Sequence, residues 1–204
     1  MSLPAGQLTL GAVHCAWRPH RHGTPAEPLV RDWLAQPLGA EAAAFVFARS
    51  ARGRPSLAAP HAGIDVNWSH SGDGLLMDYG AGVQVGVDLE ILRPRPRALE
   101  LARRFFTAQE AEALASLPDT AREHAFVRLW CAKEALLKAH GHGLSFGLDR
   151  LEFALQDDTW TLVDCDPALG APTDWTLHAF VPGPRYLATI AWRPTFAGAH
   201  PSAT

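Results

Sequence analysis

The sequence lacks the features that mark secreted, membrane-spanning and nucleic-acid-binding proteins. Cysteine is scarce, with three in 204 residues, and no pair has the spacing of a zinc site, so we expect reduced thiols in a cytoplasmic protein. The formal net charge of −3 offers no basic excess to a nucleic acid. No segment has the apolar length of a membrane span, and the first ten residues lack the pattern of a signal peptide, so neither is expected.

Composition and periodicity instead indicate a folded α+β protein. Hydrophobic residues make up 48% of the chain, which is enough for one or two modest cores. Alternating apolar residues predict strands and helical spacing predicts helices, and the two kinds occur in mixed order. The expected strands cover residues 7–17, 74–79, 83–89, 149–155, 160–163, 175–181 and 186–192; the expected helices cover 28–38, 107–117 and 120–140, and 42–49 fits either.

Two carboxylates share one face of the strand expected at 83–89. Asp88 and Glu90 lie roughly 6.5–7 Å apart on this face, opposite four aliphatic residues that alternate with them. Gly86 leaves the face bare beside them, so a ligand could approach the backbone there. Oxygen ligands of this kind suit Mg²⁺. For this motif taken alone, an edge strand with two solvated acids is the simpler explanation.

The helix expected at 120–140 carries a carboxylate and an amine one turn apart. Thr120 and Glu123 have the spacing of a capping box at its start. Glu134 and Lys138 then face the same way. A surface ion pair would account for both, but a tryptophan one turn earlier is expected to bury the base of this face.

Further motifs surround these two, and together they carry a resemblance. They are Arg52-Gly53-Arg54-Pro55-Ser56-Leu57, Asn67-Trp68-Ser69-His70-Ser71, Phe105-Phe106-Thr107-Ala108-Gln109-Glu110 and Gly141-His142-Gly143-Leu144. In this order and at these spacings, the chain resembles the 4′-phosphopantetheinyl transferases of the Sfp-type class. Each motif is weak alone, whereas GxDxE, FFxxxE, WxxKExxxK and the SHS segment in sequence are specific.

The resemblance implies a fold and a reaction. The fold would have two similar α+β halves, residues 1–82 and 83–204, related by a pseudo-two-fold with coenzyme A in the cleft between them. The reaction would move the phosphopantetheine arm of coenzyme A to a serine of an acyl or peptidyl carrier protein and release adenosine 3′,5′-bisphosphate. Asp88, Glu90 and Glu134 would hold Mg²⁺, for which Mn²⁺ can substitute. Glu134 would also be the base, directly or through water, and Lys138 would neutralise charge on the pyrophosphate.

The same resemblance assigns contacts to coenzyme A. Ser69 and His70 would contact its phosphates, and Arg54 would replace a lysine beside the adenine nucleotide, where it can bind phosphate in bidentate fashion. Lys133 would assist Lys138 or pair with an acid nearby. Basic residues near the N-terminus would bind the 3′-phosphate, with Arg21 and Arg31 as candidates, although a solvated basic stretch explains them equally well.

The segment after the carboxylate strand suggests a docking site for the carrier. Arg93, Arg95 and Arg97 alternate with prolines, which favour an extended conformation, and the resemblance implies an acidic carrier surface. A solvated linker is the alternative. A monomer is expected. Two other functions stay open: a different Mg²⁺-dependent phosphoryl-transfer enzyme or hydrolase, and an inactive relative that only binds coenzyme A or a carrier.

Overall fold

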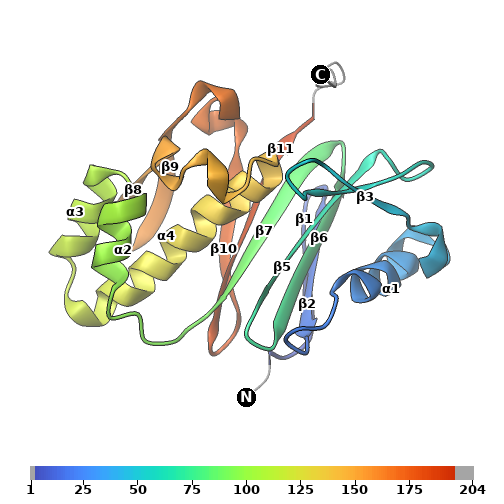
Figure 1. Ribbon diagram of the computed structural model, residues 1–204, viewed down its shortest axis with the longest axis horizontal. Helices are drawn as coiled ribbons and strands as arrows, with labels where there is room; N and C mark the ends of the chain where they lie inside the picture. The colour runs from blue at the N-terminus through green and yellow to red at the C-terminus, as the bar shows by residue number, and fades with distance from the viewer. Residues whose placement is uncertain (1–2, 196–204) are drawn as a thin grey trace.

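The computed structural model describes residues 3–195, and it confirms the α+β class (Figure 1). The N-terminal half has a four-stranded antiparallel sheet in the order β1-β2-β6-β5. Its elements are β1 (Gly6–Leu10), β2 (Val13–Pro19), α1 (Glu27–Leu38), η1 (Ala42–Ala44), β3 (Phe47–Arg49), β4 (Pro55–Leu57), β5 (Ile64–Ser71) and β6 (Gly74–Ala81). Helix α1 covers one face of this sheet through Val30 and Leu34, and β3 and β4 form a separate hairpin.

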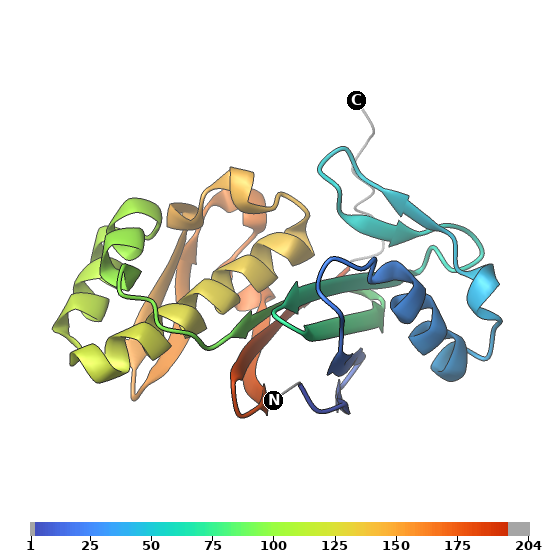
Figure 2. The ribbon, with the colours of Figure 1, turned by 60° about the horizontal axis from the view of Figure 1, so that its bottom comes forward.

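The C-terminal half has a three-stranded antiparallel sheet in the order β10-β11-β7, which the long helix α4 crosses (Figures 1 and 2). Its elements are β7 (Val83–Ile91), α2 (Ala98–Phe105), α3 (Ala108–Ser116), α4 (Asp119–His140), η2 (Leu144–Phe146), η3 (Leu148–Arg150), β8 (Leu151–Gln156), β9 (Thr159–Cys165), η4 (Pro167–Leu169), η5 (Pro172–Asp174), β10 (Thr176–Gly183) and β11 (Tyr186–Pro194). Within residues 3–195, no helix has the length and apolar character needed to cross a bilayer.

The two sheets meet where β5 lies beside β7. Side chains of β5 accept hydrogen bonds from the backbone of β7: Asp65 from the Val85 N–H at 2.8 Å, and Ser71 from the Ile91 N–H at 3.1 Å. Each pair is 20 residues apart in the chain, so the two strands run parallel. Side chains therefore join the halves at this line, and polar side chains of β5 are held against β7.

A central apolar core joins the same two halves. The alternating aliphatics of β7 are all buried in it, as the pattern predicted: Val83, Val85, Val87 and Leu89. Val13, Cys15 and Leu76 enter it from the N-terminal half, and Tyr186 and Ile190 enter from β11. The boundary near residue 82 and a two-fold relation between the halves remain predictions.

The opposite face of β7 is covered by α4, which corrects the expectation for Gly86. A Cβ atom on Gly86 would lie 2.3 Å from the backbone nitrogen of Ala139 and 2.4 Å from the carbonyl oxygen of Ala135. The missing side chain therefore admits the helix backbone, not a ligand. Close approach of α4 brings Glu134 and Lys138 to the same face as Asp88.

Several local predictions were wrong. Residues 7–17 form two strands, because Gly11 adopts φ 59° in a turn between them. Strand β5 and helix α2 were not predicted. A capping box forms at Thr107 and Glu110, where α3 begins. The one expected at Thr120 and Glu123 does not form: α4 begins at Asp119 without a side-chain cap, and Glu123 accepts a hydrogen bond from the Arg95 N–H.

Candidate active site

Three polar side chains from three elements meet where β5, β7 and α4 converge. Lys138 Nζ lies 2.7 Å from Asp88 Oδ1 and 2.8 Å from Ser69 Oγ. The Ser69 hydroxyl also donates to Asp88 Oδ1 at 2.9 Å. Asp88 and Ser69 are 4% and 7% exposed, so the cluster is screened little by water. Burial alone would lower the pKa of Lys138, but the charges of Asp88 and Glu134 raise it, so the ammonium stays protonated.

Glu134 lies at the edge of this cluster. Its Oε2 is 4.0 Å from Lys138 Nζ, one helical turn away. Burial, followed by the negative charge of Asp88, raises the pKa of Glu134 to about 7. A carboxylate with a pKa near neutrality can both accept and return a proton, which is the property a general base needs.

Glu90, the second acid of the strand, forms an ion pair with an arginine. Arg95 Nη2 lies 2.7 Å from Glu90 Oε2, and the Ser71 hydroxyl donates to the same oxygen at 3.3 Å. Burial and the charge of Asp88 raise the pKa of Glu90 despite the arginine. Glu90 therefore lies in the same negative field as Asp88 but is not free.

The three acids have the chemistry of a cation site without its geometry. Within residues 3–195, no three acidic, histidine or cysteine side chains are arranged to hold a metal ion. However, Asp88 Oδ2 is buried with no hydrogen-bond partner in this same range, and Asp88 raises the pKa values of both Glu90 and Glu134. A divalent cation would satisfy that oxygen and offset the repulsion, so the residues fit one once Arg95 releases Glu90.

A basic cleft opens beside Lys138. Its volume is about 210 Å³, and its lining residues are Arg49, Arg52, Gly53, Arg54, Pro55, Asn67, Trp68, Lys138, Gly141 and Gly143. The Arg49 guanidinium stacks 5.3 Å from the centre of the Trp68 ring. Arg52 is exposed at the rim. An aromatic ring, cationic side chains and glycine backbone together suit an anionic ligand with a flat ring.

Comparison with known proteins places the chain in a family. The model of the 4′-phosphopantetheinyl transferase superfamily matches residues 84–191. The 4′-phosphopantetheinyl transferase HetI of Nostoc sp. is 36% identical over 183 residues, which cover 86% of this chain and 74% of HetI. The chain belongs to the 4′-phosphopantetheinyl transferase superfamily.

Two other relatives share a smaller part of their length. The 4′-phosphopantetheinyl transferase of Bacillus subtilis is 33% identical over 132 residues, which cover 64% of this chain and 56% of that protein. The human L-aminoadipate-semialdehyde dehydrogenase-phosphopantetheinyl transferase is 33% identical over 137 residues, covering 62% and 44%. The chain thus spans about half the length of these two relatives. Enzymes of this family move phosphopantetheine from coenzyme A to carrier proteins.

As a phosphopantetheinyl transferase, the chain uses Arg54 differently from the prediction. The Arg54 guanidinium forms a bidentate ion pair with Asp65, at 2.8 and 2.5 Å. Its remaining N–H groups donate to carbonyl oxygens of Pro55, Val85, Lys138 and Ala139. No donor is left for a phosphate, so the predicted phosphate contact is replaced by a clamp on the C-terminal end of α4. In the cleft, Arg52 is exposed, whereas Arg49 stacks on Trp68, pairs with Glu27 at 3.3 Å and donates to the Gly53 carbonyl oxygen.

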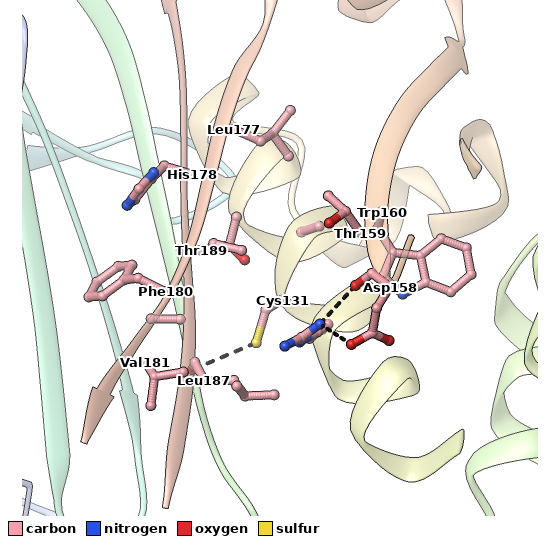
Figure 3. A pocket seen from close by; sticks show the side chains of 14 residues that line it. Cys131, Asp158, Thr159, Trp160, Leu177, His178, Phe180, Val181, Leu187 and Thr189 are labelled. Carbon is pink, nitrogen blue, oxygen red and sulfur yellow. Dashed lines mark hydrogen bonds and ion pairs between the residues drawn. The ribbon is translucent and has the colours of Figure 1, made fainter. Parts of the chain in front are cut away.

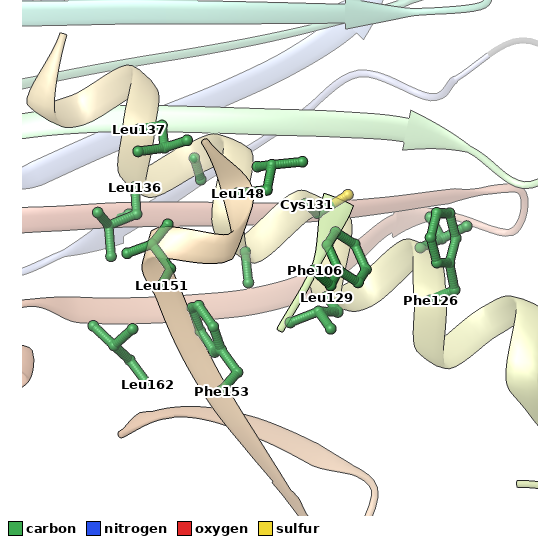
Figure 4. Packing of buried hydrophobic residues seen from close by; sticks show 14 of the residues in the cluster. Phe106, Phe126, Leu129, Cys131, Leu136, Leu137, Leu148, Leu151, Phe153 and Leu162 are labelled. Carbon is green, nitrogen blue, oxygen red and sulfur yellow. The ribbon is translucent and has the colours of Figure 1, made fainter. Parts of the chain in front are cut away.

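Lys133 lies apart from the cluster of Lys138, Asp88 and Ser69. It is 0% exposed, and its ammonium lies 2.7 Å from Glu110 and donates to the carbonyl oxygens of Leu148 and Leu151. It also faces the rings of Phe106 and Phe153, which belong to the apolar core shown in Figure 4. The predicted contact with coenzyme A is therefore wrong, and the alternative, a pair with an acid nearby, is what the structure shows. The FFxxxE motif accordingly supplies Glu110 to the core.

The basic N-terminal stretch places His20, which was not among the predicted residues, beside His70. His70 is exposed on the face of β5 opposite Ser69, and its ring lies 5.8 Å from that of His20, which is 5% exposed. Arg21 is exposed. Arg31 forms an ion pair with Glu27 and donates to the Phe45 carbonyl oxygen, so it already has protein partners. The only feature of the sequence that points to His20 is its position within a run of basic residues.

A second cavity lies on the other side of α4. It has a volume of about 310 Å³ between α4, the β8–β9 turn, β10 and β11, and Arg128 and Asp158 pair at its edge (Figure 3). It shares no lining residue with the basic cleft. Its side chains are chiefly apolar, and the polar cluster at Lys138 does not open into it.

Proposed function

We propose that this chain transfers the 4′-phosphopantetheine arm of coenzyme A to a serine of an apo carrier protein in an Mg²⁺-dependent reaction. The observation that supports this most directly is the ion pair of Lys138 and Asp88, with Glu134 beside it, at the edge of a basic cleft. The nucleotide of coenzyme A would lie in the cleft, with its ring near Trp68 and its phosphates near Arg49, Arg52 and Lys138. His70 and His20 are further candidates for a phosphate contact.

The transfer needs one bond to form and one to break. The serine oxygen bonds to the phosphorus that carries the pantetheine arm, and the bond from this phosphorus to the bridging oxygen breaks. Adenosine 3′,5′-bisphosphate leaves, and the serine proton passes to Glu134, directly or through water. Lys138 stabilises the negative charge that develops on the leaving group. Asp88, Glu134 and Glu90 would hold Mg²⁺, which when bound supplies further charge neutralisation at the pyrophosphate.

The test is incubation with coenzyme A, Mg²⁺ and a panel of apo carrier proteins from fatty-acid, polyketide and nonribosomal-peptide systems, followed by mass measurement of the carriers. The expected mass gain is one phosphopantetheine, lost in excess chelator and recovered with Mn²⁺. Release of phosphate products without carrier modification would favour the hydrolase alternative. Binding of coenzyme A without turnover would favour an inactive relative.

The metal assignment has its own test. Asp88→Asn and Glu134→Gln keep the size of each side chain and are each expected to lower turnover by two orders of magnitude or more, about 3 kcal/mol of transition-state stabilisation. Glu90→Gln is expected to cost less, because a water oxygen can replace its ligand. Near-normal turnover in Asp88→Asn would mean that the strand acids only pair with basic side chains.

Docking of the carrier on the arginine-rich segment is supported only in part. Arg93 is exposed, whereas Arg97 pairs with Glu100 and Arg95 with Glu90. We therefore retain Arg93 as the docking residue and expect Arg93→Ser to raise the KM for the carrier at low salt, with a smaller effect at high salt. A monomeric state and a cytoplasmic location complete the proposal, and light scattering tests the former.

A further inference from the structure

Asp78 lies in the middle of the N-terminal sheet, fully buried, and neither carboxylate oxygen has a hydrogen-bond partner among residues 3–195. It sits on β6 directly opposite Cys15 of β2 and Asn67 of β5. Residues directly opposite in an antiparallel pair point to the same face, with Cβ atoms about 4.5–5.5 Å apart. The row Cys15, Asp78, Asn67 therefore shares one face, and Asp78 lies between a thiol and an amide.

Asn67 continues this row into the basic cleft. It is 4% exposed and lines the cleft together with Trp68 and Lys138. Its Oδ1 is buried and, like both oxygens of Asp78, has no hydrogen-bond partner in the part of the chain that the structure describes. An amide oxygen and a carboxylate are both acceptors, so the two side chains can bond to each other through these oxygens only if a proton lies between them.

The two cations that face Asp78, Arg54 and Lys138, are each paired with another acid. Arg54 faces it from the β4 side but is committed to Asp65, a second acid on the same face of β5. Lys138 faces it from α4 but is committed to Asp88 and Ser69. Burial, followed by the charge of Asp65, raises the pKa of Asp78 well above its ordinary value, although Arg54, the Asn67 backbone N–H and Lys138 oppose the rise. Burial also raises the pKa of the Cys15 thiol, so Cys15 stays neutral.

We infer that Asp78 is a neutral carboxylic acid whose proton is donated to Asn67 Oδ1, and that this bond fixes the Asn67 amide with its Nδ2 toward the ligand in the cleft. Asp78 is then a positioning residue, and Asn67 donates a hydrogen bond to coenzyme A. The inference deepens the proposed function, because it takes coenzyme A as the ligand of the cleft.

The first measurement asks only whether Asp78 is protonated. Infrared spectra of wild type and Asp78→Asn are compared at neutral pH. The expected difference is the carbonyl stretch of one protonated carboxylic acid, present in wild type alone and shifted in D₂O. Absence of this band overturns the inference, whatever the protein does with coenzyme A.

The second measurement asks whether the proton positions Asn67. Asp78→Leu removes the donor, whereas Asp78→Asn restores a neutral donor of the same size. We expect Asp78→Leu to raise the KM for coenzyme A about tenfold with kcat within twofold, because a ground-state contact is lost, and Asp78→Asn to return KM toward wild type. Equal KM in wild type and Asp78→Leu would overturn the positioning role.

Two further comparisons keep the inference testable if Asp78→Leu does not fold. Asn67→Ala is expected to raise KM by a similar factor, and adding Asp78→Asn to it should change KM no further. An additional rise in KM in the double variant would mean that Asp78 acts elsewhere. If wild type fails to modify any carrier, the proposed function fails, and calorimetric titration of coenzyme A with the same variants replaces KM.

Discussion

Lys138 of α4 and Asp88 of β7 form an ion pair with 2.7 Å between Nζ and Oδ1, and they do so across the point where the helix backbone rests on Gly86. The pair is therefore set by the packing of α4 on β7, not by the side chains alone. Lys133, five residues earlier on the same helix, is 0% exposed and pairs with Glu110 in the core. The two lysines of one motif therefore lie in different environments, and substitutions at each are expected to affect different properties: turnover for Lys138 and stability for Lys133.

Lys138→Met is expected to lower kcat by two orders of magnitude or more while the fold is kept. The methionine fills the space of the lysine stem but removes the charge aimed at the leaving phosphate, which costs about 3 kcal/mol in comparable sites. Turnover and the melting temperature are measured on the same sample. A large fall in melting temperature with normal turnover would contradict the catalytic role.

Lys133→Met is expected to act on stability instead. Burial lowers the pKa of Lys133 to about 8, although Glu110 opposes that shift, so the lysine is held as the partner of a buried acid. Removing one partner of a buried pair typically costs about 3–5 kcal/mol. Denaturant unfolding should show this loss, and the KM for coenzyme A should not change in the folded fraction. Recovery of stability in the double variant Lys133→Met/Glu110→Gln is the control.

The features that the sequence could predict are those carried by local patterns. Alternation identified the buried face of β7, glycine marked the end of α4 at Gly141, and the ordered motifs identified the family that the comparisons confirm. Both Glu134 and Lys138 lie on the predicted side of the helix, because residues four apart on a helix face the same way.

The features that the sequence could not predict are pairings over long chain distances. Arg54 meets Asp65 and the end of α4, and Arg95 turns back onto Glu90. No periodicity specifies which acid an arginine will contact, because that depends on how two elements pack. The burial of Asp78 was not predicted for the same reason. One acid in a short strand pattern does not show that a strand will pair on each side of it.

Gly86→Ala is expected to lower both stability and turnover. The added methyl group would overlap backbone atoms of Ala135 and Ala139, which cannot move as a flexible side chain can. Overpacking of this kind costs about 1–3 kcal/mol, and a shift of α4 would separate Lys138 from Asp88. Gly63→Ala is the matched control, since its Cβ would meet no atom of the described chain within 4 Å. Wild-type turnover in Gly86→Ala would show that the close packing is not needed.

His140 is expected to make the protein less stable in acid. Burial, followed by the charges of His142 and Arg193, lowers the pKa of His140 to about 4. Its unfolded pKa is about 6.5, so between these values the unfolded state binds more protons, and stability falls as pH drops from about 6.5 to 4. His140→Gln should reduce the loss of melting temperature between pH 7 and pH 5, whereas replacement of the exposed His22 should not. An unchanged loss would contradict this assignment.

Arg95→Gln is expected to strengthen metal binding. Arg95 Nη2 lies 2.7 Å from Glu90 Oε2, so its guanidinium stands where a cation would have to compete for that carboxylate. Among the described residues, the buried Nε of Arg95 has no hydrogen-bond partner, so the guanidinium is incompletely bonded. Glutamine removes the charge and keeps the backbone N–H that donates to Glu123. Glu90 would then be available to the metal with Asp88 and Glu134.

Calorimetric titration of Mn²⁺ without coenzyme A measures this effect apart from turnover. The dissociation constant should fall about tenfold in Arg95→Gln, which corresponds to removing about 1.4 kcal/mol of competition. Arg97→Gln is the matched control, because its partner is the exposed Glu100 and not an acid of the site. If Arg95→Gln binds Mn²⁺ no better than wild type while Asp88→Asn still abolishes binding, Glu90 is not a ligand and Arg95 is its permanent partner.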